Sequence, residues 1–351
     1  MPVDRSWPAV LESLVTGHDL SVAEASWAME RVMLGEATPA QLGGLLTALR
    51  FKGETVDEIV GFRDAALANA LPLAVDPLAL DIVGTGGDPY GAVINISSAA
   101  SIVAAAAGVP VVKHGNRAAS SSSGASDVLG ALGLDTTIGP ERTGEVLREV
   151  GITFAFAATF HPGFRHAGPV RSQLGISTLF NILGPLCNPA RPEASAVGVA
   201  QLERVPLVVG VFRARGATAL VYRGDDGIDK LSTTGHSHIW EVSRGAVTEH
   251  DLDPRELGIP LVPVEALLGR GPESNAERIR AVLAGQRGAD RDIVLLNAAA
   301  GLAAFALAKN PELLREPILD RLRAQLAVAA EAVDSGAAAA KLEAWVAATN
   351  R

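Results

Sequence analysis

Lys113 to Asp127 form the segment with the most distinctive chemistry in the chain, KHGNRAASSSSGASD. It follows the apolar stretch VPVV directly and holds two cations, a histidine, an asparagine, two glycines and five serines. A lysine ammonium acts as a point charge toward phosphate, whereas serine hydroxyls and loop N–H groups make directional hydrogen bonds. A segment with so few core side chains is costly to order, so its donors predict a bound anion. The alternative interpretation, a solvated surface loop, explains the serines. It does not explain why the KHGNR run directly follows an apolar strand of the kind that is usually buried.

A second anion-binding element is predicted at Gly84 to Asp88, with the sequence GTGGD. It follows LDIV and precedes NISSAASIVAAAAG, a helical pattern that begins near Asn95. Glycines let backbone N–H groups approach a phosphate closely, and a helix N-terminus adds its dipole. The segment is not a Walker A loop, and Pro89 occupies the third glycine position of GxGxxG. Glycines alone indicate only a tight turn, but the NISS helix start favours anion binding.

Carboxylates and an arginine complete the candidate chemistry. Gly224 to Asp229, GDDGID, places three aspartates after ALVYR, and oxygen ligands beside glycines suit Mg²⁺; aspartates that cap a turn explain the pattern equally well. Arg171 is a natural bidentate partner for a carboxylate, although its pattern alone favours a helix-surface residue. His236 and His238 alternate as on one strand face without a third ligand, so no zinc site is predicted. Cys187 has no visible base partner and is interpreted as a packing residue.

The elements that must position these residues are of two kinds. The first seventy or so residues contain three capping boxes before amphipathic helical stretches, at Ser21–Glu24, Thr38–Gln41 and Thr55–Glu58. From Asp81 onward, short apolar runs end in polar loops and precede helical patterns, which predicts an α/β domain with a mostly parallel sheet. The three polar loops should lie at the carboxyl ends of the strands, where such sheets bind ligands. The Ala-rich segment 324–346 is predicted to be helical. The predicted fold class is α/β, with a small helical domain plus a larger α/β domain.

The composition limits the possible classes of function. With 351 residues and 48% hydrophobic content the chain can bury a sizeable core, and 4% aromatic residues imply small aliphatic packing. The net charge of -9 disfavours nucleic acid as a partner. A single cysteine excludes an internal disulfide and fits a reducing cytoplasm. We predict a cytoplasmic protein with no membrane partner, because no signal-peptide pattern and no convincing spanning stretch is visible.

In combination, GTGGD, NIS, KHGNRAASSSSG, HP, RxxLGxxTxFNxLGPLxNP and GDDGID resemble the anthranilate phosphoribosyltransferase family of tryptophan biosynthesis. The resemblance covers nearly the whole chain. It implies the fold shared with pyrimidine nucleoside phosphorylases, and a homodimer built through the helical domains. It also implies a helical domain of residues 1–75 plus about 171–192 and an α/β domain of residues 76–170 plus 193–351, with hinges near residues 75 and 190.

The resemblance further implies a reaction and its residues. The amine of anthranilate would attack C1 of 5-phosphoribosyl 1-pyrophosphate (PRPP), and pyrophosphate would leave, with Mg²⁺ as the cofactor. The residues implied to bind PRPP are Gly84, Gly87, Asp88, Asn95, Ser97, Ser98, Lys113, His114, Gly115, Asn116, Arg117, Ser120 and Ser121. Those implied to contact anthranilate are Gly84, His114, Asn116 and Arg171. The implied metal ligands are Ser97 and Asp229. No catalytic base is expected, since the aryl amine is neutral and the barrier is lowered by stabilising the leaving charge.

Two features depart from the family pattern. The loop PYGAVI after GTGGD is one residue longer than the family's and lacks its threonine. Lys230 follows Asp229 where the family has a glutamate metal ligand, and a charged lysine cannot bind a metal. Three outcomes remain open for Lys230: its ammonium contacts pyrophosphate directly, Asp226 replaces the missing ligand, or the side chain points to solvent.

Three other functions fit parts of the pattern. A nucleoside phosphorylase shares the implied fold but needs a nucleobase pocket and a different signature in place of KHGNRAASS. A non-catalytic relative that binds nucleic acid should be basic and should have lost parts of the substrate motifs. A paralogous phosphoribosyltransferase with another aromatic amine acceptor fits every motif, because acceptor choice depends on few contacts.

Overall fold

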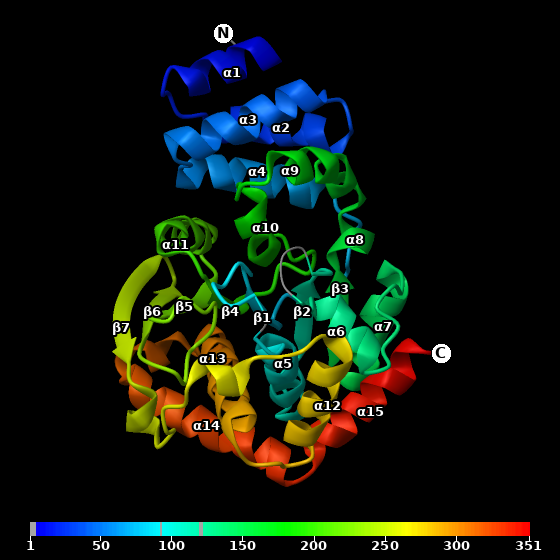
Figure 1. The fold of residues 1–351 in the computed structure, drawn as a ribbon, viewed down its shortest axis with the longest axis vertical. Helices are drawn as coiled ribbons and strands as arrows, with labels where there is room; N and C mark the ends of the chain where they lie inside the picture. Colours follow the sequence, from blue (N-terminus) through cyan, green and yellow to red (C-terminus); the bar gives the residue numbers. More distant parts are fainter. Residues whose placement is uncertain (1–4, 92, 119–121) are drawn as a thin grey trace.

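The computed structural model describes residues 5–91, 93–118 and 122–351. A helical bundle lies at one end of the molecule, and a seven-stranded sheet flanked by helices forms the rest (Figure 1). The predicted combination of a small helical part and a larger α/β part is therefore confirmed.

The N-terminal helices begin where the capping boxes predict. They are α1 (Trp7–Val15), α2 (Val22–Met33), α3 (Pro39–Lys52) and α4 (Val56–Ala68). The side chains of Ser21, Thr38 and Thr55 each accept the backbone N–H three residues later. The glutamate or glutamine at that later position bonds back to the backbone N–H of the cap residue. Because these bonds are local, the sequence alone fixes where α2, α3 and α4 start.

The sheet has the order β3-β2-β1-β4-β5-β6-β7. Its strands are β1 (Leu80–Gly84), β2 (Val111–Gly115), β3 (Ile152–Phe156), β4 (Ala194–Gly198), β5 (Thr218–Gly224), β6 (Ser237–Ser243) and β7 (Ala246–Leu252). The first five strands are parallel, and β6 and β7 are antiparallel. Side chains alternate between the faces, so Ile82 packs in one apolar core and Val83 in the other.

Helices cover both faces of the sheet (Figure 1). The larger ones are α5 (Ile96–Ala106), α7 (Pro140–Val150), α11 (Val205–Arg215), α12 (Pro272–Leu283), α13 (Ala289–Lys309), α14 (Ile318–Asp334) and α15 (Ala337–Thr349). The shorter ones are α6 (Ala125–Ala131), η2 (Leu202–Arg204), η3 (Pro254–Leu257), η4 (Val264–Leu267) and η5 (Pro311–Arg315). The C-terminal segment 324–346 is helical but spans parts of two helices, because Gly336 adopts φ 80 between α14 and α15.

Helix α13 forms the centre of the α/β core. It packs against α5 and α14 and against strands β1, β4 and β5. A Cβ atom at Gly301 would lie 2.5 Å from Cδ1 of Ile82, so glycine is what lets the helix approach the sheet. Among the described residues it is the one helix long and apolar enough to cross a membrane, and 78% of its apolar window is buried inside the fold. Its composition is thus explained by its place in the core.

The chain returns to the helical bundle after β3. The returning elements are α8 (Ala157–Phe160), η1 (Pro162–His166), α9 (Gly168–Leu174) and α10 (Phe180–Leu186). In Figure 1 they lie below and beside α4, where η1 packs on α2 and α9 on α3. Helix α10 contacts α4, β2 and α11, so it lies between the bundle and the sheet. Arg171 on α9 is thereby held above the carboxyl ends of the strands.

Candidate active site

The candidate site lies at the carboxyl ends of β1, β2 and β4. The strand order reverses direction between β1 and β4, which is where open α/β sheets form a ligand crevice. A cavity of ≈ 310 Å³ lies there, beneath α9 and α10. It is lined by every predicted site residue that the structure describes, namely Gly84, Gly87, Asp88, Asn95, Ser97, Ser98, Lys113, His114, Gly115, Asn116, Arg117, Arg171 and Asp229. Ser120 and Ser121 lie outside the described residues.

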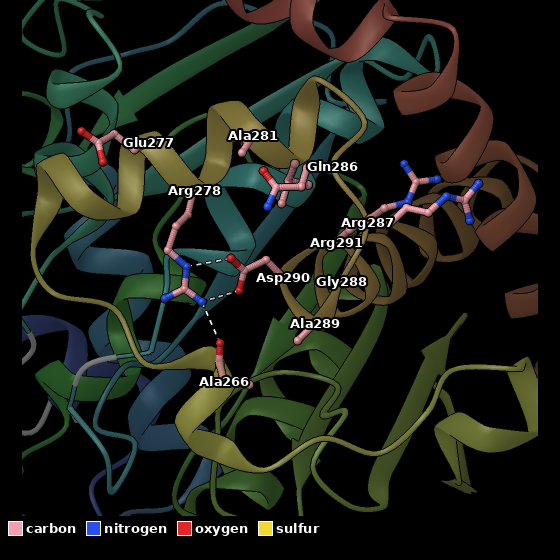
Figure 2. Close-up of a pocket in the computed structure, with 11 residues that line it drawn as sticks. Ala266, Glu277, Arg278, Ala281, Gln286, Arg287, Gly288, Ala289, Asp290 and Arg291 are labelled. Atoms are coloured by element: carbon pink, nitrogen blue, oxygen red, sulfur yellow. Dashed lines mark hydrogen bonds and ion pairs between the residues drawn. The ribbon is translucent and has the colours of Figure 1, made fainter.

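Another cavity, of ≈ 370 Å³, lies between α12 and the start of α13, and two of its three arginines have partners. Figure 2 shows Arg278 held by Asp290 and by the carbonyl oxygen of Ala266. The two nitrogens of Arg278 that bind Asp290 are 2.7 and 2.5 Å from its carboxylate oxygens. Arg291 is paired with Asp334 at 2.8 Å. The third arginine, Arg287, is exposed, but the described lining of this cavity has none of the lysine and serine groups of the first one.

The GTGGD loop leaves β1 in a conformation that only glycines adopt easily. Gly86 and Gly87 have φ 68 and 77, in the left-handed region. A Cβ atom at Gly84 would lie 2.0 Å from Oδ2 of Asp229, so no other residue fits there without displacement. Asp88 closes the loop, because its Oδ1 accepts the N–H groups of Tyr90 and Gly91. The loop backbone is thus held against the cavity.

The start of α5 presents hydroxyl groups to the cavity. Asn95 precedes the helix, but its amide does not cap it and binds other segments instead. Its Nδ2 donates to the carbonyl oxygen of Ser123 at 3.0 Å, and its Oδ1 accepts from Asn275 at 2.9 Å. Ser98 Oγ is buried and has no hydrogen-bond partner among the residues that the structure describes. A buried hydroxyl without a partner is costly, and a bound oxyanion would satisfy it.

Lys113 is a buried cation within β2. Its Nζ donates to the carbonyl oxygen of Ile82 at 2.9 Å and lies 3.4 Å from Oγ of Ser97. Burial lowers the pKa of Lys113 to about 8, Asp81 opposes this shift, and the nearby charge of Lys230 adds to it. Burial raises the pKa of the Asp81 carboxyl group to about 6, although Lys113 and Asn188 favour its charged form. Near neutral pH the ammonium is therefore charged and able to bind an anion.

His114 is a neutral hydrogen-bond acceptor. Its Nδ1 lies 2.8 Å from the carbonyl oxygen of Gly184. Because a carbonyl oxygen can only accept a hydrogen bond, Nδ1 carries the proton and Nε2 is unprotonated. Nε2 is buried, and within the described part of the chain it has no hydrogen-bond partner. Burial, with a smaller contribution from His161, lowers the pKa of His114 to about 3. A ligand N–H group could satisfy this nitrogen.

The KHGNR loop is closed by a carboxylate rather than by apolar packing. Oδ2 of Asp127 accepts the N–H groups of Ala118 and Gly124, both at 2.9 Å. A Cβ atom at Gly124 would lie 2.2 Å from the nitrogen of Ala118, so a glycine is required at this contact. Asn116 and Arg117 are exposed at the cavity rim. Their side chains are placed to meet a ligand that enters from solvent.

The opposite wall combines aromatic rings with a guanidinium group. The guanidinium carbon of Arg171 lies 5.1 Å from the centroid of the Phe180 ring, and Phe164 meets Phe180 edge-to-face at 5.7 Å. All three residues line the cavity, and so does Asn181. An aromatic ligand with a carboxylate matches this wall, since rings pack on rings and guanidinium binds carboxylate. An adjoining cavity of ≈ 520 Å³ shares Arg171 and Asn181 with the site.

Only one aspartate of GDDGID lines the cavity. Oδ2 of Asp229 accepts the N–H of Gly86 at 2.8 Å, and its Oδ1 lies 2.5 Å from Nζ of Lys230. Asp226 is held by Ile228 N–H and by the hydroxyl of Ser232, and it does not reach the cavity. The hypothesis that Asp226 swings in to replace a missing metal ligand therefore requires these hydrogen bonds to break. The hypothesis that Lys230 points to solvent is wrong, since only 11% of its side chain is exposed.

Comparisons with known proteins agree with this geometry. Residues 8–70 match the model of the glycosyl transferase family, helical bundle domain, and residues 76–339 match that of the glycosyl transferase family, a/b domain. A protein of Clavibacter sepedonicus named anthranilate phosphoribosyltransferase is 74% identical over 349 residues, which is 99% of each chain. The chain belongs to the anthranilate phosphoribosyltransferase family. Another member, from Leifsonia xyli, is 69% identical over 99% of this chain and 100% of its own.

Solved structures of the anthranilate phosphoribosyltransferase family share the fold. That of the Thermus thermophilus enzyme has a TM-score of 0.88 and 41% identity, over 97% of this chain and 99% of its own. That of the Saccharomyces cerevisiae enzyme in complex with PRPP and Mg has a TM-score of 0.87 and 25% identity, over 99% of both chains. These matches confirm that the protein is an enzyme of the glycosyltransferase class. They support the main interpretation of the sequence over a nucleoside phosphorylase or a nucleic-acid-binding relative.

The two metal ligands implied by the resemblance differ in how well they fit Mg²⁺. Mg²⁺ keeps several waters and takes one or two protein ligands beside substrate phosphates, and the hydroxyl of Ser97 can serve as one such ligand at the cavity wall. Asp229 does not fit, because an ammonium group occupies one of its oxygens and a backbone N–H the other. Within the described ranges, no cluster of three or more His, Cys, Asp or Glu residues is arranged to hold a metal.

Sequence reasoning missed several residues of the cavity wall. Phe164, Phe180 and Asn181 line it but were not selected from the sequence as binding residues. The FN pair of FNILGPL was visible as part of a motif, but an aromatic residue on a helix is more often a core residue. Their role emerges only because α10 is placed above the ends of β1 and β2.

Proposed function

We propose that the protein transfers the phosphoribosyl group of PRPP to the amine of anthranilate, which releases pyrophosphate, as a step of tryptophan biosynthesis. The observation that carries the proposal is one cavity with anion donors on its sheet side and an arginine beside aromatic rings on its helical side. Family membership agrees with this assignment. The acceptor's amine then faces the sugar carbon, since phosphates and carboxylate are held at opposite walls.

On the donor side, the sheet ends bind the two phosphate-bearing parts of PRPP. The GTGGD backbone and the first turn of α5, with Ser97 and Ser98, would take the pyrophosphate group. Lys113 and the loop up to Asp127, including Asn116 and Arg117, would enclose the phosphoribosyl part, which is the bound anion that offsets the cost of ordering this loop. Bound to the donor, Mg²⁺ would supply further neutralisation of the departing pyrophosphate, with Ser97 as its protein ligand.

On the acceptor side, Arg171 would bind the carboxylate of anthranilate while Phe180 and Phe164 flank its ring. His114 stays neutral because its pKa is lowered to about 3, so its bare Nε2 would accept a hydrogen bond from the attacking amine. In the reaction the C1–O bond breaks with its electron pair going to pyrophosphate, the N–C1 bond forms, and the amine then loses a proton. The residues orient both partners and stabilise the leaving charge rather than abstract a proton early.

The assembly expected from the resemblance is part of the same proposal. We propose a homodimer in the cytoplasm, with residues 1–75 plus about 171–192 acting as one domain that closes on the rest. The packing of α9 on α3 supports that division, whereas η1, which packs on α2, lies before its boundary at residue 171. Closure would exclude water, which otherwise hydrolyses the activated sugar.

The test uses purified protein, PRPP, Mg²⁺ and anthranilate, and follows the loss of anthranilate fluorescence together with release of pyrophosphate. We expect both to proceed at the same rate and to require all three small molecules. Turnover of another aromatic amine with none of anthranilate would overturn the proposed acceptor.

A further inference from the structure

Lys230 is a cation built into the wall of the active-site cavity. It lies in the loop after β5, and its side chain turns inward, with 11% of it exposed. Its Nζ is 2.5 Å from Oδ1 of Asp229. A Cβ atom built on Gly84 would lie 2.8 Å from that Nζ, so the ammonium sits directly against the start of the GTGGD loop. Lys230 also lines the same cavity as Lys113 and Ser97.

The pair formed by Asp229 and Lys230 occupies the position where a second metal would have to bind. Mg²⁺ binds carboxylate oxygens at about 2.0–2.1 Å, whereas Oδ1 of Asp229 already has an ammonium at 2.5 Å. The other oxygen of Asp229 accepts the N–H of Gly86. A metal would have to displace the ammonium of Lys230, which is covalently part of the residue next to Asp229 and cannot diffuse away. If the ammonium stayed, the two positive charges would repel each other strongly at a few ångströms. Asp229 therefore holds Lys230 and not a metal ion.

We propose that the ammonium of Lys230 is a direct binding group for the pyrophosphate part of the donor and for the pyrophosphate product. This inference rests on the proposed function. An ammonium has three N–H donors, and Asp229 uses one of them. Because Nζ lies against Gly84 at the cavity wall, its remaining donors are available to a ligand held by the GTGGD loop. Asp229 acts as a positioning residue, because it fixes the direction of the lysine side chain.

Two consequences separate this arrangement from a site with two metals. Pyrophosphate should bind measurably without any divalent ion, because Lys113 and Lys230 both contribute fixed positive charge. The dependence of activity on Mg²⁺ should follow a single saturation curve, since only the Ser97 side of the cavity suits a donor-bound ion. A lysine that only neutralises Asp229 would also leave a single Mg²⁺ dependence, so the loss of metal-free pyrophosphate affinity when Lys230 is removed is the result that separates the two roles.

The experiment is calorimetric titration of inorganic pyrophosphate into the protein in EDTA, with wild type, Lys230→Met and the double variant Asp229→Asn/Lys230→Met. The double variant removes both charges and so avoids leaving Asp229 unpaired. We expect both variants to bind pyrophosphate about 10-fold or more weakly than wild type, as for the loss of a charge-assisted hydrogen bond. Lys309→Met, at the exposed end of α13, serves as the control, because it changes the net charge by the same amount as Lys230→Met. It should bind pyrophosphate as wild type does.

A second arm tests the metal directly. Lys230→Glu places a second carboxylate beside Asp229, and its activity should show an additional Mg²⁺ dependence that wild type lacks. Equal metal-free pyrophosphate affinity in wild type and both Lys230→Met variants would overturn the inference, as would two distinct Mg²⁺ dependences in wild type. Turnover of PRPP and anthranilate by wild type is measured separately, so failure of the proposed function shows there and not in the pyrophosphate titration.

Discussion

Replacement of Arg171 by alanine should damage acceptor binding and leave donor binding nearly intact. The guanidinium is half-buried at the cavity wall, 5.1 Å from the ring centroid of Phe180, and among the described residues it forms no ion pair with a carboxylate. Its charge is thus available to the carboxylate of a ligand, and the ring contact fixes its direction before the ligand arrives.

The size of the effect follows from the bonds that are lost. Hydrogen bonds to charged groups contribute about 1.5–3 kcal/mol, and each 1.4 kcal/mol is a factor of ten in affinity. Arg171→Ala should therefore raise the KM for anthranilate by about 10- to 150-fold. The KM for PRPP should change by less than about threefold, since the donor groups lie on the opposite wall.

The assay is steady-state kinetics with anthranilate fluorescence, with each substrate varied at a saturating level of the other. Arg171→Lys serves as the control, because it keeps the charge but lacks the planar guanidinium group that binds a carboxylate through two hydrogen bonds. It should recover only part of the lost anthranilate affinity. The thermal midpoint should hardly move, because no intramolecular ion pair is broken. Equal increases in both KM values would refute the assignment of Arg171 to the acceptor.

Further predictions concern charge and stability. Because burial lowers the pKa of Lys113 to about 8, kcat/KM for PRPP should fall as pH rises through about 8, and this fall should be absent in Lys113→Met. The folded-state pKa of Lys113 is below its ordinary value of 10.5, so the unfolded chain binds more protons between those values and Lys113 should make the free energy of unfolding rise with pH there; urea titrations that show no difference from Lys113→Met would count against this. Arg204 and Glu54 form an ion pair with both side chains 2% exposed, so Arg204→Met should cost about 3–5 kcal/mol of stability by leaving a buried carboxylate unpaired. The double variant Glu54→Gln/Arg204→Met should recover much of that loss, and a single-variant cost below about 1 kcal/mol would show that the pair is not shielded from water.

The features predicted correctly from the sequence depend on local chemistry. The starts of α2, α3 and α4 follow from the capping boxes at Ser21, Thr38 and Thr55, because each bond spans three residues. The strands before GTGGD and KHGNR follow from short apolar runs that end in polar loops. These patterns are sufficient for the fold class and for placing the GTGGD and KHGNR loops at the cavity, while their role as anion donors stays a prediction.

The features that were missed depend on contacts between distant segments. Parallel pairing brings β4 beside β1, and no local pattern specifies that neighbour. The neutral state of His114 depends on its burial by other segments, and the carbonyl of Gly184, 70 residues away, fixes which ring nitrogen carries the proton. The inward turn of Lys230 depends on the space left by Gly84 at the end of β1. In each case the charge or the direction of a side chain is set by a partner from another element.

The measurement that tests the central claim most directly is calorimetric binding of anthranilate to the protein already saturated with Mg²⁺ and pyrophosphate, for wild type and Arg171→Ala. The account places donor groups and the acceptor's arginine at opposite walls of one cavity. It predicts that both ligands bind together in wild type and that Arg171→Ala loses anthranilate binding while its pyrophosphate affinity is unchanged. Competition between anthranilate and pyrophosphate in wild type, or equal loss of both in the variant, would contradict it.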